Sequence, residues 1–133
     1  MSEVGDAFVR KAKESVAGAA SEHANRRYNN VANRCYYACF QAAIGTLVKA
    51  GIRPTGGGET WSHAMVQSQF AGVLIGRRKM YPTSMRDTLQ QLSLLRNQGD
   101  YNDTDVSQTQ ALRALGRCRT FVATIDTKEG ATT

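Results

Sequence analysis

The stretch 35-CYYACFQAAIGTLV-48 decides the fold of this chain. Only Gln41 and Thr46 interrupt its run of apolar or small side chains. A helix of this composition is buried nearly all round. The stretch is also too short to cross a bilayer, which needs about 20 apolar residues. It therefore predicts the central helix of a helical bundle.

Helical periodicity continues on both sides of this stretch, and no segment alternates between apolar and polar residues as a half-exposed strand would. The two prolines, Pro54 and Pro82, both fall in expected connections. We therefore expect an all-α fold, an antiparallel up-down bundle of four to five helices. The first four expected helices cover residues 5–22, 25–50, 60–75 and 83–98, and the fifth starts between 106 and 108.

Three helix ends carry recognisable capping residues. Thr60 or Ser62 can cap the third helix. Ser107 with Gln110 has the spacing of a capping box at the start of the fifth helix. Gly99 suits the left-handed position that often follows a helix, so we expect the fourth helix to end against it.

The length of 133 residues predicts a single domain, residues 1–127, followed by a flexible tail at 128–133. The N-terminal segment is charged, and no stretch approaches about 18 uninterrupted apolar residues. We therefore expect a cytoplasmic protein without a membrane partner. The net charge of +6 and the pI of about 9.6 are compatible with RNA, DNA or nucleotides as ligands.

Three cysteines lie in apolar segments. Cys35 and Cys39 are spaced for one helix face and could clamp a metal ion, but no second Cys or His pair completes such a site. Free thiols behave as small apolar side chains. We therefore expect Cys35, Cys39 and Cys118 to be buried, with no metal and no cofactor.

The polar stretch RNQGDY begins at Arg96 and ends the fourth helical pattern. Arg96 lies eleven residues after Met85 and nearly in register with Leu92, so it points along the packed face. A half-buried guanidinium needs a partner, which Asp100, Asp103 or a bound phosphate could supply. The pattern leaves two hypotheses open, an internal salt bridge at the end of the helix or a binding site.

A polar stripe also follows the second helix, and small residues continue it at Ala38 and Gly45. Small side chains allow another helix or a ligand to come close. The stripe consists of Arg27, Asn30, Arg34 and Gln41.

Three blocks resemble the HEPN-domain family. The block 33-NRCYYACFQAA-43 is similar to the family's N/S-R-x-Y-Y-A-x-F-x-A-A signature, and 61-WSHAMVQSQF-70 to its T-H-S-x-x-x-x-x-F stretch. The third block, 95-LRNQGDYND-103, is similar to L-R-x-x-A-D-Y-D/N-D. The resemblance, which spans about residues 26–125, implies a bundle of four or five helices that commonly forms a homodimer.

The resemblance also implies a chemistry. Active members cleave RNA without a metal, using an arginine followed four to six residues later by a histidine. Arg96 matches the arginine, but Tyr101 stands at the histidine position, and the only histidines are His23 and His63. Tyrosine, with a pKa near 10, is a poor general base at neutral pH. Asp100 has no ready protonated form for the leaving group. These departures favour binding over cleavage.

Three functions remain open. The first is a homodimeric module that holds the phosphate of a nucleotide or of RNA. Such a module would be the partner of a small nucleotidyltransferase, as in a toxin–antitoxin pair. The second is a ribonuclease toxin in which Asp100 or Tyr101 replaces the histidine. The third is a structural interaction protein whose RNQGDY stretch merely ends a helix. The residues expected to bind are Arg34, Arg96, Asp100 and Tyr101, with Arg27, Asn30, Tyr37 and His63 as secondary candidates.

His63 has two interpretations. In one, it caps the third helix and forms a hydrogen bond within the fold, which the pattern favours. In the other, it reaches the polar end of the bundle and contacts a phosphate or the neighbours of Arg96.

Overall fold

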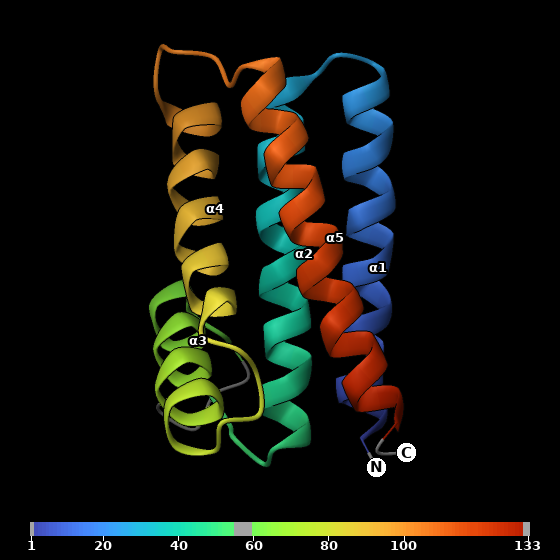
Figure 1. Cartoon of the computed structure of the whole chain (residues 1–133), viewed down its shortest axis with the longest axis vertical. Coiled ribbons are helices and arrows are strands. Elements are labelled where there is room, and N and C mark those ends of the chain that lie inside the picture. The colour runs from blue at the N-terminus through green and yellow to red at the C-terminus, as the bar shows by residue number, and fades with distance from the viewer. Residues whose placement is uncertain (1, 55–59, 132–133) are drawn as a thin grey trace.

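The computed structural model describes residues 2–54 and 60–131, which form helices joined by turns and short connections (Figure 1). Four helices run along the long axis, each antiparallel to the next: α1 (Glu3–Ala24), α2 (Tyr28–Lys49), α4 (Ser84–Tyr101) and α5 (Gln108–Ala131). A shorter helix, α3 (His63–Gln69), continues into the π-helix η2 (Phe70–Arg77). The described residues contain no strand, so the predicted all-α bundle is confirmed.

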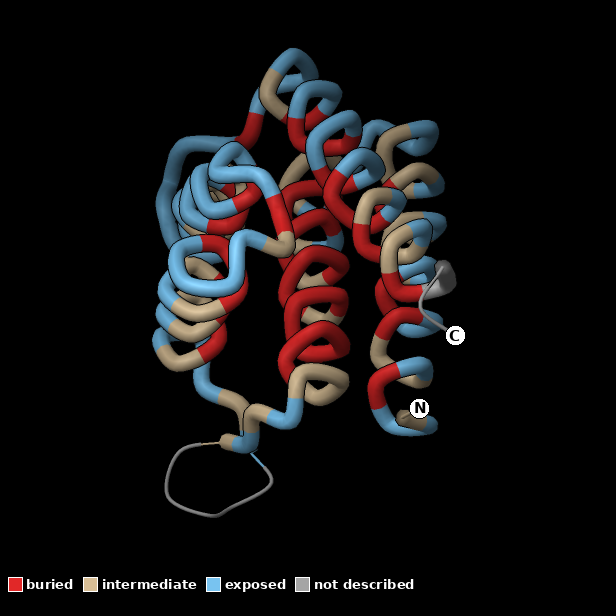
Figure 2. Tube along the Cα trace, turned by 60° about the horizontal axis from the view of Figure 1, so that its bottom comes forward, coloured by how far each residue is buried: buried red, intermediate tan, exposed pale blue. Residues whose placement is uncertain are grey.

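Helix α2 is the centre of the bundle and packs against α1, α4 and α5. From Cys35 to Leu47 every residue is buried except Tyr37 and Gln41, which are half-buried (Figure 2). Each large apolar side chain removed from water contributes about 1.5–3 kcal/mol. The predicted central helix is therefore confirmed, and its burial holds the other helices together. None of the helices in the described part is long and apolar enough to cross a membrane.

The connection between α1 and α2 is a tight turn over residues 25–27. Arg26 has a positive φ of 61°, and the Arg27 amide donates to the Glu22 carbonyl at 2.9 Å. The chain reverses within this turn, so α2 begins at Tyr28 and not at residue 25.

The third helix begins as predicted, with Ser62 as its cap. The Ser62 hydroxyl accepts the amide of Met65 at 3.1 Å. The 3.6-residue period did not predict the wider π-helical turns from Phe70 to Arg77, which keep Phe70, Leu74 and Ile75 buried. Both α3 and α4 lie on the same side of α2 (Figure 1).

The prediction that the fourth helix ends against Gly99 is wrong. Helix α4 continues to Tyr101, and among the described glycines only Gly51 has a positive φ. A Cβ atom at Gly99 would lie 3.2 Å from the Asn29 carbonyl oxygen and 3.3 Å from Val106 Cγ2. Glycine is therefore present because α4 approaches the backbone of α2 closely, and not because the helix stops.

Helix α5 starts with the predicted capping box. The Gln110 amide donates to Ser107 Oγ at 3.1 Å, and the Ser107 amide donates to Gln110 Oε1 at 3.0 Å. At its other end α5 reaches Ala131, so residues 128–131 belong to the helix and not to the tail predicted at 128–133. Residues 132 and 133 lie outside the described residues. Glu129 anchors this end, because its buried carboxylate accepts the Tyr81 hydroxyl at 2.5 Å.

Candidate functional site

Arg96 reaches from α4 toward α2, as its register predicted, and its side chain is only 14% exposed. Its guanidinium carbon lies 5.3 Å from the ring centre of Tyr36, 5.5 Å from that of Tyr37 and 5.8 Å from that of Tyr101. Each such contact between a cation and an aromatic ring contributes about 0.5–2 kcal/mol. Three aromatic rings thus take the place of much of the water around this charge.

The hydrogen bonds of Arg96 are all long. Its Nη1 atom is 3.4 Å from both Asp100 Oδ2 and Tyr37 Oη, and its Nη2 atom is 3.3 Å from Asn97 Oδ1. Strong bonds between a cation and a carboxylate measure about 2.7–2.9 Å. The Nε atom is buried and has no hydrogen-bond partner in the described part of the chain. The predicted internal salt bridge exists, but it leaves much of the guanidinium's donor capacity unused.

Asp100 lies between α4 and α2 and is held from both sides. The side-chain amide of Asn33 donates to Asp100 Oδ2 at 3.1 Å, and the same oxygen receives Arg96. The carboxylate side chain is 24% exposed, so an approaching anion would meet its negative charge. Asn33 is absent from the predicted site. Its place four residues before Tyr37, on the same helix face, is the sequence signal that could have identified it.

His63, the first residue of α3, joins this cluster. Its Nδ1 atom is 2.7 Å from the Tyr36 hydroxyl, and its ring stacks on Phe40 with 4.7 Å between ring centres. Burial and the positive charge of Arg96 lower the pKa of His63 below its usual value. The hydrogen bond within the fold agrees with the first interpretation, although Ser62 and not His63 caps the helix. Its position beside the tyrosines around Arg96 agrees with the second.

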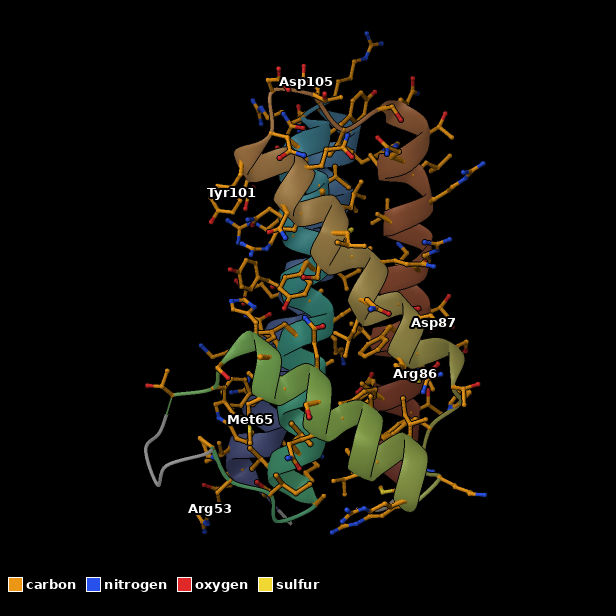
Figure 3. All side chains as sticks on the ribbon, turned by 90° about the vertical axis from the view of Figure 1, so that its left-hand side faces the viewer. Arg53, Met65, Arg86, Asp87, Tyr101 and Asp105 are labelled. Atoms are coloured by element: carbon orange, nitrogen blue, oxygen red, sulfur yellow. The ribbon has the colours of Figure 1, made fainter. Side chains whose placement is uncertain are left out.

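Tyr101 stands at the open edge of the cluster. Its ring packs against the Arg96 guanidinium, yet the residue is 74% exposed. Figure 3 shows its side chain at the last turn of α4, directed away from the bundle. An exposed ring beside a guanidinium is a surface on which a nucleobase can stack.

The remaining predicted residues lie outside the cluster. Arg34 is exposed and leans toward α1, where its Cδ atom is 3.9 Å from the position a Cβ would take at Gly18. Arg27 pairs with Glu22 at 3.5 Å, and Asn30 is exposed near the start of α2. The structure therefore brings together Arg96, Asp100, Tyr101, Tyr37 and His63, and it does not bring Arg34, Arg27 or Asn30 to them.

The three cysteines are free and buried, as predicted. Burial raises the pKa of the Cys39 thiol well above its usual value, so it stays protonated at neutral pH. Within residues 2–54 and 60–129, no three His, Cys, Asp or Glu side chains are grouped so that they could hold a metal ion.

Comparison with known families agrees with this architecture. Residues 6–128 match the HEPN domain. The chain belongs to the HEPN domain family. No curated protein matches it. The resemblance of the three sequence blocks is therefore confirmed, and the HEPN match includes Arg96, Asp100 and Tyr101.

Proposed function

We propose that this HEPN-domain protein binds the phosphate of a nucleotide or of RNA at Arg96 without cleaving it. HEPN domains are associated with nucleotide- and RNA-related functions. The observation that carries the proposal is the weak hydrogen bonding of the Arg96 guanidinium. It is held among three tyrosine rings, its hydrogen bonds are long, and its buried Nε has no partner in the described part of the chain. A cation out of water is costly unless strongly paired, and a phosphate would supply short, charged bonds.

The neighbours of Arg96 suit the rest of a nucleotide. The exposed ring of Tyr101 can stack on a base, a contact that contributes about 1–3 kcal/mol. The Tyr37 hydroxyl, 3.4 Å from Arg96 Nη1, can donate to a phosphate oxygen. Asp100 competes with the phosphate for the guanidinium, so binding requires Asp100 to yield part of its contact.

The test is titration of the purified protein with AMP and with a fluorescent single-stranded RNA of 12 nucleotides. Arg96→Met keeps the aliphatic stem and removes the charge, and we expect it to weaken both affinities at least about tenfold, since a hydrogen bond to a charged group contributes about 1.5–3 kcal/mol. Arg113→Met is the matched control, because Arg113 is exposed on α5 and makes no ion pair within the described residues. Equal binding by Arg96→Met and the wild type would disprove the proposal.

The proposed assembly is a homodimer formed through α4. Leu94 is 66% exposed, so α4 presents a large apolar side chain on its outer face. A second copy covering this face would bring two Arg96 clusters near one another. Leu94→Asp is then expected to convert a dimer to a monomer, measured by light scattering after gel filtration. A wild-type monomer at high protein concentration would exclude this assembly.

The partner expected from the family resemblance is a small nucleotidyltransferase, as in a toxin–antitoxin pair. A nucleotidyltransferase would supply or consume the nucleotide that the Arg96 cluster is proposed to hold. Co-purification of this chain with the product of an adjacent gene tests that part of the proposal. Loss of this complex in Arg96→Met would show that the partner contacts the Arg96 cluster.

A metal-independent ribonuclease is the second candidate, and one observation favours it. His63 approaches the tyrosines around Arg96 from α3, so a histidine is present although Tyr101 occupies the motif position. This candidate predicts growth arrest on expression and RNA breakdown by the pure protein, both abolished by Arg96→Ala. Intact RNA after long incubation with excess protein would exclude it.

A further inference from the structure

The aromatic neighbours of His63 hold its ring in one orientation. The ring stacks on Phe40 with an interplanar angle of 27° and on Tyr36 with an angle of 24°. The edge of Tyr37 meets it at 5.9 Å between ring centres. With the ring plane set by three aromatic side chains, the direction of each ring nitrogen is set as well.

The hydrogen bond between His63 and Tyr36 links the direction of the phenol hydrogen to the protonated nitrogen of the ring. Nδ1 of His63 and the Tyr36 hydroxyl are 2.7 Å apart, and the Gln67 amide also donates to that hydroxyl oxygen at 3.3 Å. An amide N–H can only donate, so Gln67 cannot accept the hydrogen of the phenol, whereas a neutral imidazole nitrogen can. With Nδ1 of His63 as that acceptor, the proton of the neutral ring is on Nε2.

Nε2 of His63 makes no hydrogen bond within residues 2–54 and 60–129, and the residue is exposed. Two neighbours, the rings of Tyr36 and Tyr37, are shared by His63 and the Arg96 guanidinium. Burial and the nearby Arg96 charge lower the pKa of His63, so the imidazole is neutral at physiological pH. A neutral N–H donor thus stands open to solvent at the edge of the cationic cluster.

We infer that His63 is a second phosphate ligand of this site: its Nε2–H, oriented by Tyr36, donates to an oxygen of the phosphate that Arg96 holds. The inference rests on the proposed phosphate binding at Arg96. The ligand class is a nucleotide or RNA phosphate with at least two free oxygens, one for each donor. A nitrogen that already carries a proton cannot accept one from a 2′-hydroxyl, so this arrangement favours binding over cleavage.

The first experiment needs no ligand. The chain has two histidines, so a ¹⁵N-detected NMR spectrum of the imidazole nitrogens contains two rings, and His63→Gln identifies that of His63. We expect a protonated Nε2 and an unprotonated Nδ1 at pH 7.5. In Tyr36→Phe, which lacks the hydroxyl, the ring is expected to show a mixture of both tautomers. A protonated Nδ1 in the wild type would overturn the inference and favour the ribonuclease.

The second experiment measures AMP binding by calorimetry, with adenosine as the ligand that lacks phosphate. His63→Phe keeps the ring stack and removes both nitrogens, and we expect about a tenfold loss of AMP affinity, as for one hydrogen bond to a charged group. In His63→Gln the side-chain amide can replace Nε2–H, so affinity should stay near that of the wild type. Adenosine affinity should be the same in all three proteins.

The failures of the two proposals are distinguishable. If Arg96→Met binds AMP as the wild type does, or the wild type binds none, phosphate binding at Arg96 is wrong, and the His63 inference falls with it. If Arg96→Met loses AMP while His63→Phe keeps wild-type affinity, the site stands and only the role of His63 is overturned. Circular dichroism of each variant confirms that the helices are intact.

Discussion

Two groups in this molecule combine a tyrosine, a carboxylate and a cation, and they differ in what they leave unpaired. In the first, the Tyr81 hydroxyl donates to Glu129 at 2.5 Å, and the Lys128 ammonium lies 5.4 Å from the Tyr81 ring centre. Tyr81 and Glu129 are 4% and 6% exposed. This closed group joins the end of α5 to the connection before α4.

The second group, around Arg96, has similar chemistry with the opposite outcome. Its bonds to Asp100 and Tyr37 measure 3.4 Å, the guanidinium Nε has no partner in the described part of the chain, and Tyr101 is mostly exposed. A short, buried bond locks two elements together, whereas long bonds around a weakly paired cation can be exchanged for bonds to a ligand. The contrast teaches that unused hydrogen-bonding capacity, more than the residue types, separates a site from a structural anchor.

Of the predicted changes, disruption of the closed group around Tyr81 and Glu129 should have the largest effect on stability. Glu129→Ala leaves the buried Tyr81 hydroxyl without this acceptor, so the free energy of unfolding should fall by about 1–3 kcal/mol. Glu129→Gln retains an acceptor oxygen and should cost less. Urea unfolding followed by circular dichroism gives both values, and AMP binding should not change. A Glu129→Ala protein as stable as the wild type would refute the assignment of this group as an anchor.

Two glycine-to-alanine substitutions compare Gly99, which is closely packed, with Gly116, which has free space around it. A Cβ at Gly99 would press on the Asn29 backbone, so Gly99→Ala should destabilise the fold by about 1–3 kcal/mol, as overpacking does. Gly116, on α5, has nothing within 4 Å of the same position. Gly116→Ala should therefore stabilise the fold by about 0.5–1 kcal/mol through helix propensity. Melting temperatures that shift in the same direction for both variants would contradict this account.

Asp100 should behave unlike Glu129. Its ion pair with Arg96 is long and partly exposed, so Asp100→Asn should change the free energy of unfolding by less than about 1 kcal/mol. Removing the competing carboxylate should instead raise AMP affinity about threefold to tenfold, as expected for about 1 kcal/mol of relieved repulsion. Calorimetry with Asn33→Ala alongside separates the charge from the amide contact. Weaker AMP binding by Asp100→Asn would mean that the carboxylate serves the ligand.

The smallest expected effect is a pH dependence from His63. Its pKa is lowered in the folded state, so the unfolded chain binds its proton more readily. The free energy of unfolding should therefore decrease as the pH falls below about 6.5, the ordinary pKa of histidine. His63→Gln should flatten that part of the profile. An identical pH dependence of the free energy of unfolding in His63→Gln would show that another group causes it.

Sequence patterns predicted what depends on one helix at a time. The register of Arg96 with the apolar positions of its helix predicted a half-buried side chain, and the spacing of Ser107 and Gln110 predicted a capping box. Patterns failed where two helices meet. Gly99 has the residue type of a helix terminator, yet the nearby backbone of α2 explains it. The polar stripe of α2 placed Arg34 among the expected binding residues, because the position of a residue around its own helix can be read from the sequence. Which helix packs against that side of α2 cannot.

By itself, the sequence determined the all-α class, the central position of α2 and the burial of the thiols, because periodicity and composition act within single helices. The family followed from the resemblance of three sequence blocks. The tertiary structure decided which polar groups meet. It brought His63 from α3 and Asn33 from α2 to the cluster around Arg96 and Asp100, and it turned Arg34 toward α1. The physical reason is that the rotation of one helix against another depends on side-chain packing across their interface, which no single helix encodes.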